Sequence, residues 1–209
     1  MSAARVVVLR HGRTGHNLRH LWQGQLDIPL DEVGVRQARA AGTVLAALGP
    51  AAVVSSDLLR ASATAEIVAT TVGLPVTLDR RLREVNAGRW QGLGRAEIAA
   101  AGDGDVLDAW RRGEDVPLGG AERPSDVGRR GAEALLEHSA ALDGGTLVVV
   151  AHGALLRAAV LTVLGLEQPR WGLLAGLGNC GWGVVQPAEP TWRLLSWGLT
   201  PPELHELGS

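Results

Sequence analysis

Short hydrophobic runs and longer stretches of helical periodicity alternate along most of the chain. Four runs have the length of a strand and lack polar alternation, as strands covered on both faces do: 5–9, 52–54, 75–78 and 146–151. Helical periodicity occupies three stretches: 31–48, 58–72 and 154–164. Two later runs are expected to form outer strands: 182–185 and 191–195. This order predicts an α/β fold, a three-layer α/β/α sandwich with a mostly parallel central sheet.

The pattern loosens between residues 87 and 131, where glycine-rich pieces surround one weak helical stretch near 106–112. We expect this segment to be a cap-like insertion over one end of the sheet, within a single domain spanning 1–209. A chain of 209 residues fits one domain of ordinary size. No internal repeat is visible, and the tail from residue 201 is expected to be frayed.

Charge and composition exclude several classes of protein. The formal net charge is −2, which gives no electrostatic footprint for nucleic acid or an anionic membrane. The hydrophobic runs are far shorter than the ~20 residues that a membrane helix needs. The single cysteine, Cys180, excludes an internal disulfide and a cysteine-rich metal site. These features predict a cytoplasmic protein.

All 20 basic residues are arginine, because the sequence contains no lysine. Schiff-base chemistry and the lysines of phosphate loops and protein kinases are therefore excluded. Arginine is also the better residue where phosphate or carboxylate needs a planar, bidentate grip.

Two histidines follow two of the predicted strands in matching contexts. His11 and Gly12 come directly after the run 5–9 and Arg10, and His152 and Gly153 directly after 146–151. Ligands of open α/β sheets bind beyond the carboxyl ends of the strands. If the two strands are parallel neighbours, both histidines face the same crevice. A single histidine at a strand end is more often an ordinary loop residue, but the repeated context favours a functional site.

Two arginines occupy positions that are unfavourable for a cation without a nearby anion. Arg10 continues a buried strand, where an unpaired guanidinium is costly. Arg60 falls in the first turn of a predicted helix, whose dipole disfavours positive charge. The partner of Arg10 is either a carboxylate, such as Glu84 or Asp57, or a bound phosphate.

Glu84 begins a loop with two glycines and a tryptophan after the third strand. One interpretation is a surface glutamate paired with Arg80, Arg81 or Arg83. The other is a carboxylic acid in the crevice with a raised pKa, able to donate a proton.

Five segments in order resemble the motifs of the histidine phosphatase superfamily, the phosphoglycerate-mutase-like proteins. Residues 9–17 (LRHGRTGHN) resemble Arg-His-Gly-x-Thr-x-x-Asn, and 23–30 (QGQLDIPL) resemble the Gln-Gly-x-x-Asp-x-x-Leu that follows it. Residues 55–65 (SSDLLRASATA) resemble Ser-Ser-x-Leu-x-Arg-Ala-x-x-Thr-Ala. Residues 83–92 resemble the loop that carries the acid, and 151–153 resemble the segment of the second histidine.

The resemblance implies a catalytic role for three residues. His11 would be the nucleophile that is phosphorylated, and His152 would stabilise the phosphoryl oxygens in the transition state. Glu84 would donate a proton to the leaving group. A neutral His11 should donate one ring N–H to a backbone carbonyl, so that its other nitrogen is free to attack phosphorus.

The same resemblance implies four substrate-binding residues. Arg10 and Arg60 would clamp the phosphate, and Asn17 and Gln23 would line the site. Phosphoryl transfer depends mainly on positioning and charge stabilisation. Two arginines can supply the positive charge that a metal ion would otherwise provide, so we expect neither a metal nor a cofactor.

Some positions depart from the motifs of the superfamily. The cap of its members often contains Gly-Gly-Glu-Ser, whereas this chain has an extra residue before Glu122 and leaves the match of that glutamate open. Arg13 and His16 add charge within the first motif and could tune the choice of substrate.

The activity expected is hydrolysis of a small phosphorylated metabolite through a phospho-histidine intermediate. Two features favour a phosphatase. The residue before Asn17 is His16, whereas the motif typical of the mutases has tryptophan at that position, and the chain is shorter than theirs. The loops at 23–27, 90–93 and 178–182 resemble small phosphatases that act on glucosyl-3-phosphoglycerate, with other sugar phosphates and α-ribazole phosphate left open. The alternatives are a cofactor-dependent phosphoglycerate mutase and a non-catalytic phosphate-binding module. The apolar segment 171–185 could form an edge that pairs two copies into a homodimer.

Overall fold

A six-stranded sheet forms the centre of the molecule in the computed structural model, which describes residues 2–201. The strands are β1 (Arg5–Arg10), β2 (Pro50–Ser55), β3 (Val76–Leu78), β4 (Thr146–Ala151), β5 (Trp182–Gln186) and β6 (Arg193–Leu199). Their order across the sheet is β3-β2-β4-β1-β5-β6. The first four strands are parallel, β5 runs antiparallel to β1, and β6 runs antiparallel to β5.

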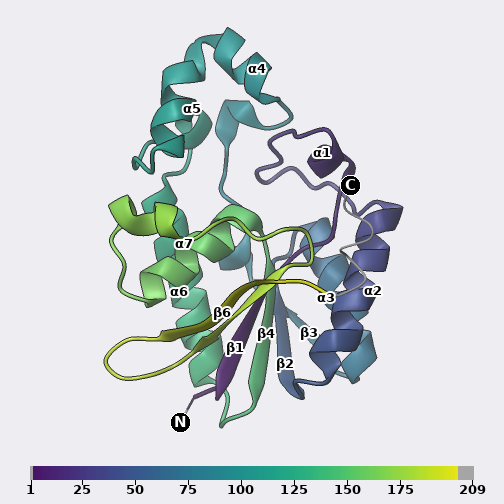
Figure 1. The fold of residues 1–209 in the computed structure, drawn as a ribbon. Coiled ribbons are helices and arrows are strands. Elements are labelled where there is room, and N and C mark those ends of the chain that lie inside the picture. The colour runs from purple at the N-terminus through teal and green to yellow at the C-terminus, as the bar shows by residue number, and fades with distance from the viewer. Residues whose placement is uncertain (1, 202–209) are drawn as a thin grey trace.

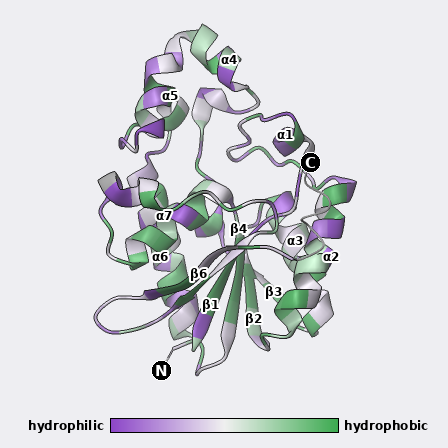
Figure 2. Ribbon diagram, viewed as in Figure 1, coloured by the Kyte–Doolittle hydropathy of each residue, from purple (hydrophilic) through white to green (hydrophobic). Residues whose placement is uncertain are grey.

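Helices cover both faces of the sheet (Figure 1). Two lie on one face, α2 (Glu32–Ala46) and α3 (Leu59–Val72), and two on the other, α6 (Pro124–Ala140) and α7 (Gly153–Val163). Alternate residues of β1 point to opposite faces: Val6 and Val8 pack with α6 and α7, and Val7 and Leu9 with α2 and α3. Figure 2 shows the resulting hydrophobic centre of the sheet. The predicted three-layer α/β/α architecture is confirmed.

Short helices link these elements and extend over the carboxyl ends of the strands (Figure 1). They are α1 (Gly15–Leu18), α4 (Arg95–Ile98), α5 (Gly104–Arg111), a π-helical turn at Ala99–Asp103, and 3-10 turns at Arg80–Leu82, Gly88–Trp90, Leu118–Gly120 and Gln168–Leu173. The weak helix expected near 106–112 corresponds to α5. The carboxylate of Asp103 accepts the indole N–H of Trp90 at 2.6 Å, which ties this segment to the loop that carries Glu84.

The structure differs from the sequence prediction at α6, which the hydrophobic pattern did not reveal. The insertion expected at 87–131 overlaps the first two turns of this helix, which lie against α7 beside the sheet. Its buried face includes Gly128, Gly131, Ala132 and Ala134, so the helix has low overall hydrophobicity although one side of it is apolar. The expected fraying of the tail lies beyond residue 201, outside the described residues.

The expected edge at 171–185 is also wrong. β5 is paired on both sides, with β1 and with β6, so it is an inner strand. The outer strand is β6, which begins two residues later than the predicted run and extends to Leu199. The residues before β5 form a 3-10 turn and a loop rather than a strand.

Candidate active site

The two histidines meet because β1 and β4 are parallel neighbours. Arg10, the last residue of β1, pairs in register with Ala151, the last residue of β4. His11 and His152 follow these residues, are both buried, and have ring centroids 5.1 Å apart. The predicted parallel pairing therefore brings the two histidine rings together, with His11 at the pocket and His152 buried behind it.

The hydrogen bond made by His11 determines which of its nitrogens is free. Its Nδ1 lies 2.7 Å from the carbonyl oxygen of Gly12 and donates to it, which leaves Nε2 with its lone pair. Burial, followed by the nearby charges of Arg60 and Arg10, holds the pKa of His11 well below its ordinary value of 6.5. The ring is therefore neutral at pH 7 and suited to nucleophilic attack.

His152 has the opposite arrangement of donor and acceptor. The hydroxyl of Ser56 accepts the backbone N–H of Leu58 at 3.3 Å and lies 2.9 Å from Nε2 of His152. When the hydroxyl proton is donated to Nε2, the ring proton resides on Nδ1, which is buried and has no partner among the described residues. Burial is the main cause that keeps the pKa of His152 well below 6.5. His152 therefore presents a neutral N–H donor.

Both arginines are held by backbone carbonyls and retain an unpartnered donor. Arg10 donates to the carbonyl of Leu177 at 2.6 Å, and Arg60 donates to Leu26 and Gly24 at 2.8 and 2.7 Å. The Nε atoms of both are buried without a partner within residues 2–201. Burial lowers the pKa of Arg10 and lowers the pKa of Arg60 to about 10, so both stay charged at neutral pH.

Of the two partners considered for Arg10, a carboxylate or a bound phosphate, the described part of the chain supplies no carboxylate. Asp57 instead forms a bidentate pair with Arg83, at 2.6 and 2.7 Å. Glu84 lies near enough to raise the pKa of Arg10 but forms no ion pair with it among the described residues. The guanidinium of Arg10 is therefore available to an anion in the pocket.

Glu84 binds the start of a helix rather than an arginine. Its carboxylate accepts the backbone N–H groups of Ala154 and Leu155 at 3.1 and 3.0 Å, in the first turn of α7, and that of Val85 at 2.9 Å. A carboxylate is favoured there by the helix dipole and the free N–H groups. The surface-pair interpretation is wrong, and Glu84 lines the same pocket as His11.

The residues of the site surround one pocket of about 480 Å³ at the carboxyl ends of the strands. Six of the seven residues singled out in the sequence line it: Arg10, His11, Asn17, Gln23, Arg60 and Glu84. The seventh, His152, is completely buried next to His11. The structure therefore groups the seven residues at one place, six of them on the pocket wall and His152 behind His11.

Two supporting residues were missed in the sequence. The hydroxyl of Thr14 lies 3.0 Å from the side-chain oxygens of both Asn17 and Gln23, and Asn179 donates to Asn17 at 3.2 Å. These contacts fix the amide oxygens and leave the amide N–H groups of Asn17 and Gln23 for a ligand. Thr14 lies within the first motif and Asn179 within the late loop, so position in a motif was the available signal.

Three charged residues whose roles the sequence left open lie outside this pocket lining. Arg13 pairs with Asp31, the N-cap of α2, at 2.9 Å. His16 is partly exposed beside Arg19. Glu122 accepts from Arg130 at 2.6 Å and from the backbone N–H of Asn86 at 2.9 Å, so it supports the loop that carries Glu84.

Two searches of the described residues gave negative results. Residues 2–201 contain no group of three or more His, Cys, Asp or Glu side chains able to hold a metal ion. In the same range, no helix has the length and apolar character required to cross a membrane.

Comparison with known families agrees with this geometry. The model of the histidine phosphatase superfamily (branch 1) matches residues 6–200. The chain belongs to this superfamily, and it is a phosphatase.

Its relatives define a narrower group. The chain is 41% identical to glucosyl-3-phosphoglycerate phosphatase of Mycolicibacterium vanbaalenii, over 94% of this chain and 95% of that protein. A solved structure of mycobacterial glucosyl-3-phosphoglycerate phosphatase with VO3 matches with a TM-score of 0.89 and 40% identity, over 95% of this chain and 100% of that one. A protein of Salmonella paratyphi C named probable phosphoglycerate mutase is 33% identical, over 92% of this chain and 89% of its own length.

Proposed function

We propose that the chain hydrolyses a small phosphorylated metabolite through a phosphoramidate intermediate on His11. One observation carries this proposal. Three buried N–H donors, on Arg10, Arg60 and His152, have no partner within the described chain and belong to the residues grouped around the nucleophile. Buried donors are nearly always satisfied, and a tetrahedral phosphoryl group offers three acceptor oxygens to match them.

The first step transfers the phosphoryl group to the enzyme. The Nε2 lone pair of His11 attacks phosphorus as the bond to the leaving oxygen breaks, and the carboxyl of Glu84 gives its proton to that oxygen. The positive charge that forms on the ring is stabilised by the hydrogen bond from Nδ1 to Gly12. Arg10, Arg60 and His152 stabilise the charge on the phosphoryl oxygens.

The second step returns the enzyme to its starting state. A water molecule attacks phosphorus, the P–N bond breaks, and the electron pair returns to Nε2 of His11. The carboxylate of Glu84 takes the proton of the water and is again ready to act as an acid. Because guanidinium groups provide the positive charge, the proposed reaction needs no metal ion.

Glucosyl-3-phosphoglycerate is the substrate we propose. Support comes from the name of the relatives that share about 41% of their residues with this chain over nearly its full length. A panel of phosphorylated metabolites that includes this compound, 3-phosphoglycerate and several sugar phosphates measures the preference. A larger kcat/KM for another class of compound overturns the assignment of substrate but not of reaction.

A phosphoglycerate mutase is the second candidate, because one relative at 33% identity carries that name. The cap between β3 and α6 distinguishes the two activities. A mutase must keep water from the phospho-histidine, whereas a phosphatase must admit it. We favour hydrolysis because this cap is short and rich in glycine.

The proposal also includes a single domain, a cytoplasmic location and a homodimer formed along β6. The exposed side chains of Leu195 and Leu199 on this outer strand support pairing between two copies. Light scattering that gives twice the 21.9 kDa of the chain supports the dimer, and a monomer mass rules it out.

Trapping the intermediate tests the reaction itself. Enzyme quenched during turnover of a labelled phosphate ester should carry label that acid removes and alkali does not, as expected for a phosphoramidate. His11→Gln should carry none, and chelation by EDTA should leave the wild-type rate intact. Acid-stable label, or label retained by His11→Gln, refutes the proposed nucleophile.

A further inference from the structure

A second, smaller pocket adjoins the candidate active site. It has a volume of about 180 Å³, and most of its lining is apolar. Three residues line both pockets: Val85, Trp110 and Ala154. The two spaces therefore adjoin along these three residues.

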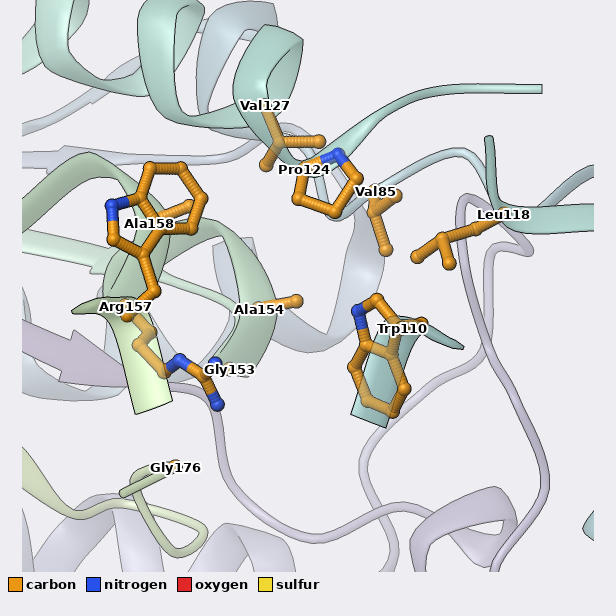
Figure 3. A pocket seen from close by; sticks show the side chains of 11 residues that line it. Val85, Trp110, Leu118, Pro124, Val127, Gly153, Ala154, Arg157, Ala158 and Gly176 are labelled. Carbon is orange, nitrogen blue, oxygen red and sulfur yellow. The ribbon is translucent and has the colours of Figure 1, made fainter. Parts of the chain in front are cut away.

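Among residues 2–201, Arg157 is the only charged side chain that lines this second pocket. It lies one helical turn after Gly153 on α7, opposite Trp110 and Leu118, with Ala154 between them (Figure 3). Burial alone lowers its pKa, and no carboxylate among the described residues offsets this effect. Arg81 and Arg83, by contrast, are ion-paired with acidic side chains. A partly buried guanidinium without a partner is costly, which points to a ligand that supplies the anion.

Glu84 fixes the direction in which a leaving group would point. Its carboxylate is bound to the N–H of Ala154, and Val85 follows it in the chain, so it lies at the wall shared by the two pockets. In the proposed reaction this carboxyl donates its proton to the leaving oxygen. The carbon skeleton attached to that oxygen is therefore closest to the second pocket.

The chemistry of the pocket favours a carboxylate over a second phosphate. A carboxylate has one charge and two oxygens, which match the fork of one guanidinium. A phosphate monoester has up to two charges and three acceptor oxygens. The apolar side chains around Arg157 cannot donate a hydrogen bond to the third oxygen of a phosphate or neutralise its second charge.

We propose that this pocket is the subsite for the leaving group, and that Arg157 selects substrates whose leaving group carries a carboxylate. This inference rests on the proposed function, since it assumes that the phosphoryl group is bound at His11. The apolar walls formed by Trp110, Leu118 and Trp171 pack against the carbon skeleton of the same group.

Two esters that differ only in the relevant group provide the test. 3-Phosphoglycerate and glycerol 3-phosphate have the same three-carbon skeleton, and a carboxylate in the first replaces a hydroxymethyl group in the second. Wild-type protein should prefer 3-phosphoglycerate in kcat/KM. Arg157→Gln should reduce this preference about ten- to hundredfold, mainly through KM, because it removes a charge-assisted hydrogen bond. Arg157→Lys should restore part of it, since lysine keeps the charge but not the fork.

A matched control separates the contact from a general loss of charge. Arg170 is exposed, precedes the pocket residue Trp171 and does not line the pocket, so Arg170→Gln should keep the wild-type preference. The proposal is overturned if the wild type does not prefer 3-phosphoglycerate, or if Arg157→Gln slows both esters equally.

Binding without turnover distinguishes failure of the subsite from failure of the proposed reaction. Calorimetry on His11→Gln protein compares the affinities of the two esters, with and without Arg157→Gln. Equal affinities in both proteins refute the subsite even if p-nitrophenyl phosphate is hydrolysed by the wild type. Loss of the preference on Arg157→Gln supports the subsite even if the nucleophile proves to be another residue.

Discussion

Four buried or nearly buried side chains, His11, His152, Arg10 and Arg60, meet where β1, β4 and α3 come together. Burying them costs free energy, because two are cations and two are kept neutral by their surroundings. The backbone carbonyls of Gly12, Leu177, Leu26 and Gly24 offset part of that cost and fix the direction of each group. The donors left over are the ones that the proposed reaction uses.

Replacement of the acid should affect substrates according to their leaving groups. In Glu84→Gln the amide oxygen can still accept the N–H groups of α7, but the side chain no longer transfers a proton. We expect kcat for sugar phosphates to fall by about 10²–10⁴-fold, and that for p-nitrophenyl phosphate far less, because its phenolate leaves without protonation. Steady-state kinetics on both esters measures this, and equal losses would contradict the role of Glu84.

The neutral histidines should make the protein less stable in acid. In the unfolded chain each has an ordinary pKa near 6.5, whereas in the fold burial holds the pKa of both well below that value. Below pH 6.5 the unfolded state therefore binds more protons, and the free energy of unfolding falls as the pH falls. At pH 5.5, one unit below the ordinary pKa, each histidine lowers the free energy of unfolding by about 1.4 kcal/mol. Thermal unfolding from pH 7.5 to 5.5 should show a steeper decline for wild type than for a variant with both histidines replaced by glutamine.

At the scale of elements, the site depends on how helices and loops pack around the sheet. Arg130 of α6 donates to the backbone carbonyls of Arg81, Arg83 and Glu84 at 2.6, 2.5 and 3.0 Å. Glu122 holds the same guanidinium. The helix that was not predicted therefore positions the loop that carries the candidate acid.

Loss of this support should reduce catalysis without removing any group of the active site. Arg130→Gln should lower kcat for sugar phosphates about 10–100-fold, as misplacement of a reacting group by about 1 Å does. Hydrolysis of p-nitrophenyl phosphate should fall less, because it depends less on Glu84. Arg129→Gln, an exposed neighbour paired with Asp126, is the control. The same loss for both esters would indicate a structural role only.

Close packing between α6 and α7 gives a prediction about stability. A Cβ atom added at Gly131 would lie 2.7 Å from that of Ala159, closer than real atoms approach. Gly131→Ala should lower the free energy of unfolding by about 1–2 kcal/mol, because overpacking outweighs the gain in helix propensity. Gly172→Ala, with nothing within 4 Å, should have little effect. Denaturant titration compares the two, and equal stabilities would contradict the packing argument.

At the scale of the whole molecule, we expect access of water to the pocket beneath α4 and α5 to decide between hydrolysis and isomerisation. These short helices lie over the carboxyl ends of the strands, and the loops beside them contain Gly102, Gly113, Gly119 and Gly120 in positive φ conformations (Figure 1). The strand order places the two histidines side by side, and the cap determines what reaches them.

Competition between hydrolysis and isomerisation tests the role of the cap. With 3-phosphoglycerate and a trace of 2,3-bisphosphoglycerate, we expect inorganic phosphate to be released faster than 2-phosphoglycerate forms. The reason is that water reaches the phospho-histidine before the product can exchange and return. Coupled assays measure both rates, and faster isomerisation would favour the mutase.

The hydrophobic pattern predicted the fold class, and the five motifs identified the candidate residues of the site. Unbroken hydrophobic runs specify strands covered on both faces, and the segments after them carry the histidines, arginines and glutamate in a recognisable order. Both signals consist of residues close together in the sequence, so they can be recognised before the fold is known. The same reasoning missed α6, because glycine and alanine make up much of its buried face and the helix has low overall hydrophobicity, although its apolar residues lie on one side.

The hydrogen-bond and ion-pair partners of the charged and polar side chains became known from the tertiary structure. Glu84 binds Ala154, 70 residues away, and His152 contacts Ser56, 96 residues away. Asp57 pairs with Arg83 rather than Arg10, and Arg157 reaches a pocket that no motif marked. These hydrogen bonds form between residues that are distant in sequence, and burial depends on the packing of the whole fold. The sequence therefore left several pairings open to each charged side chain. The packing of the helices on the sheet selects one pairing, because most buried polar groups must find a partner in the space that remains.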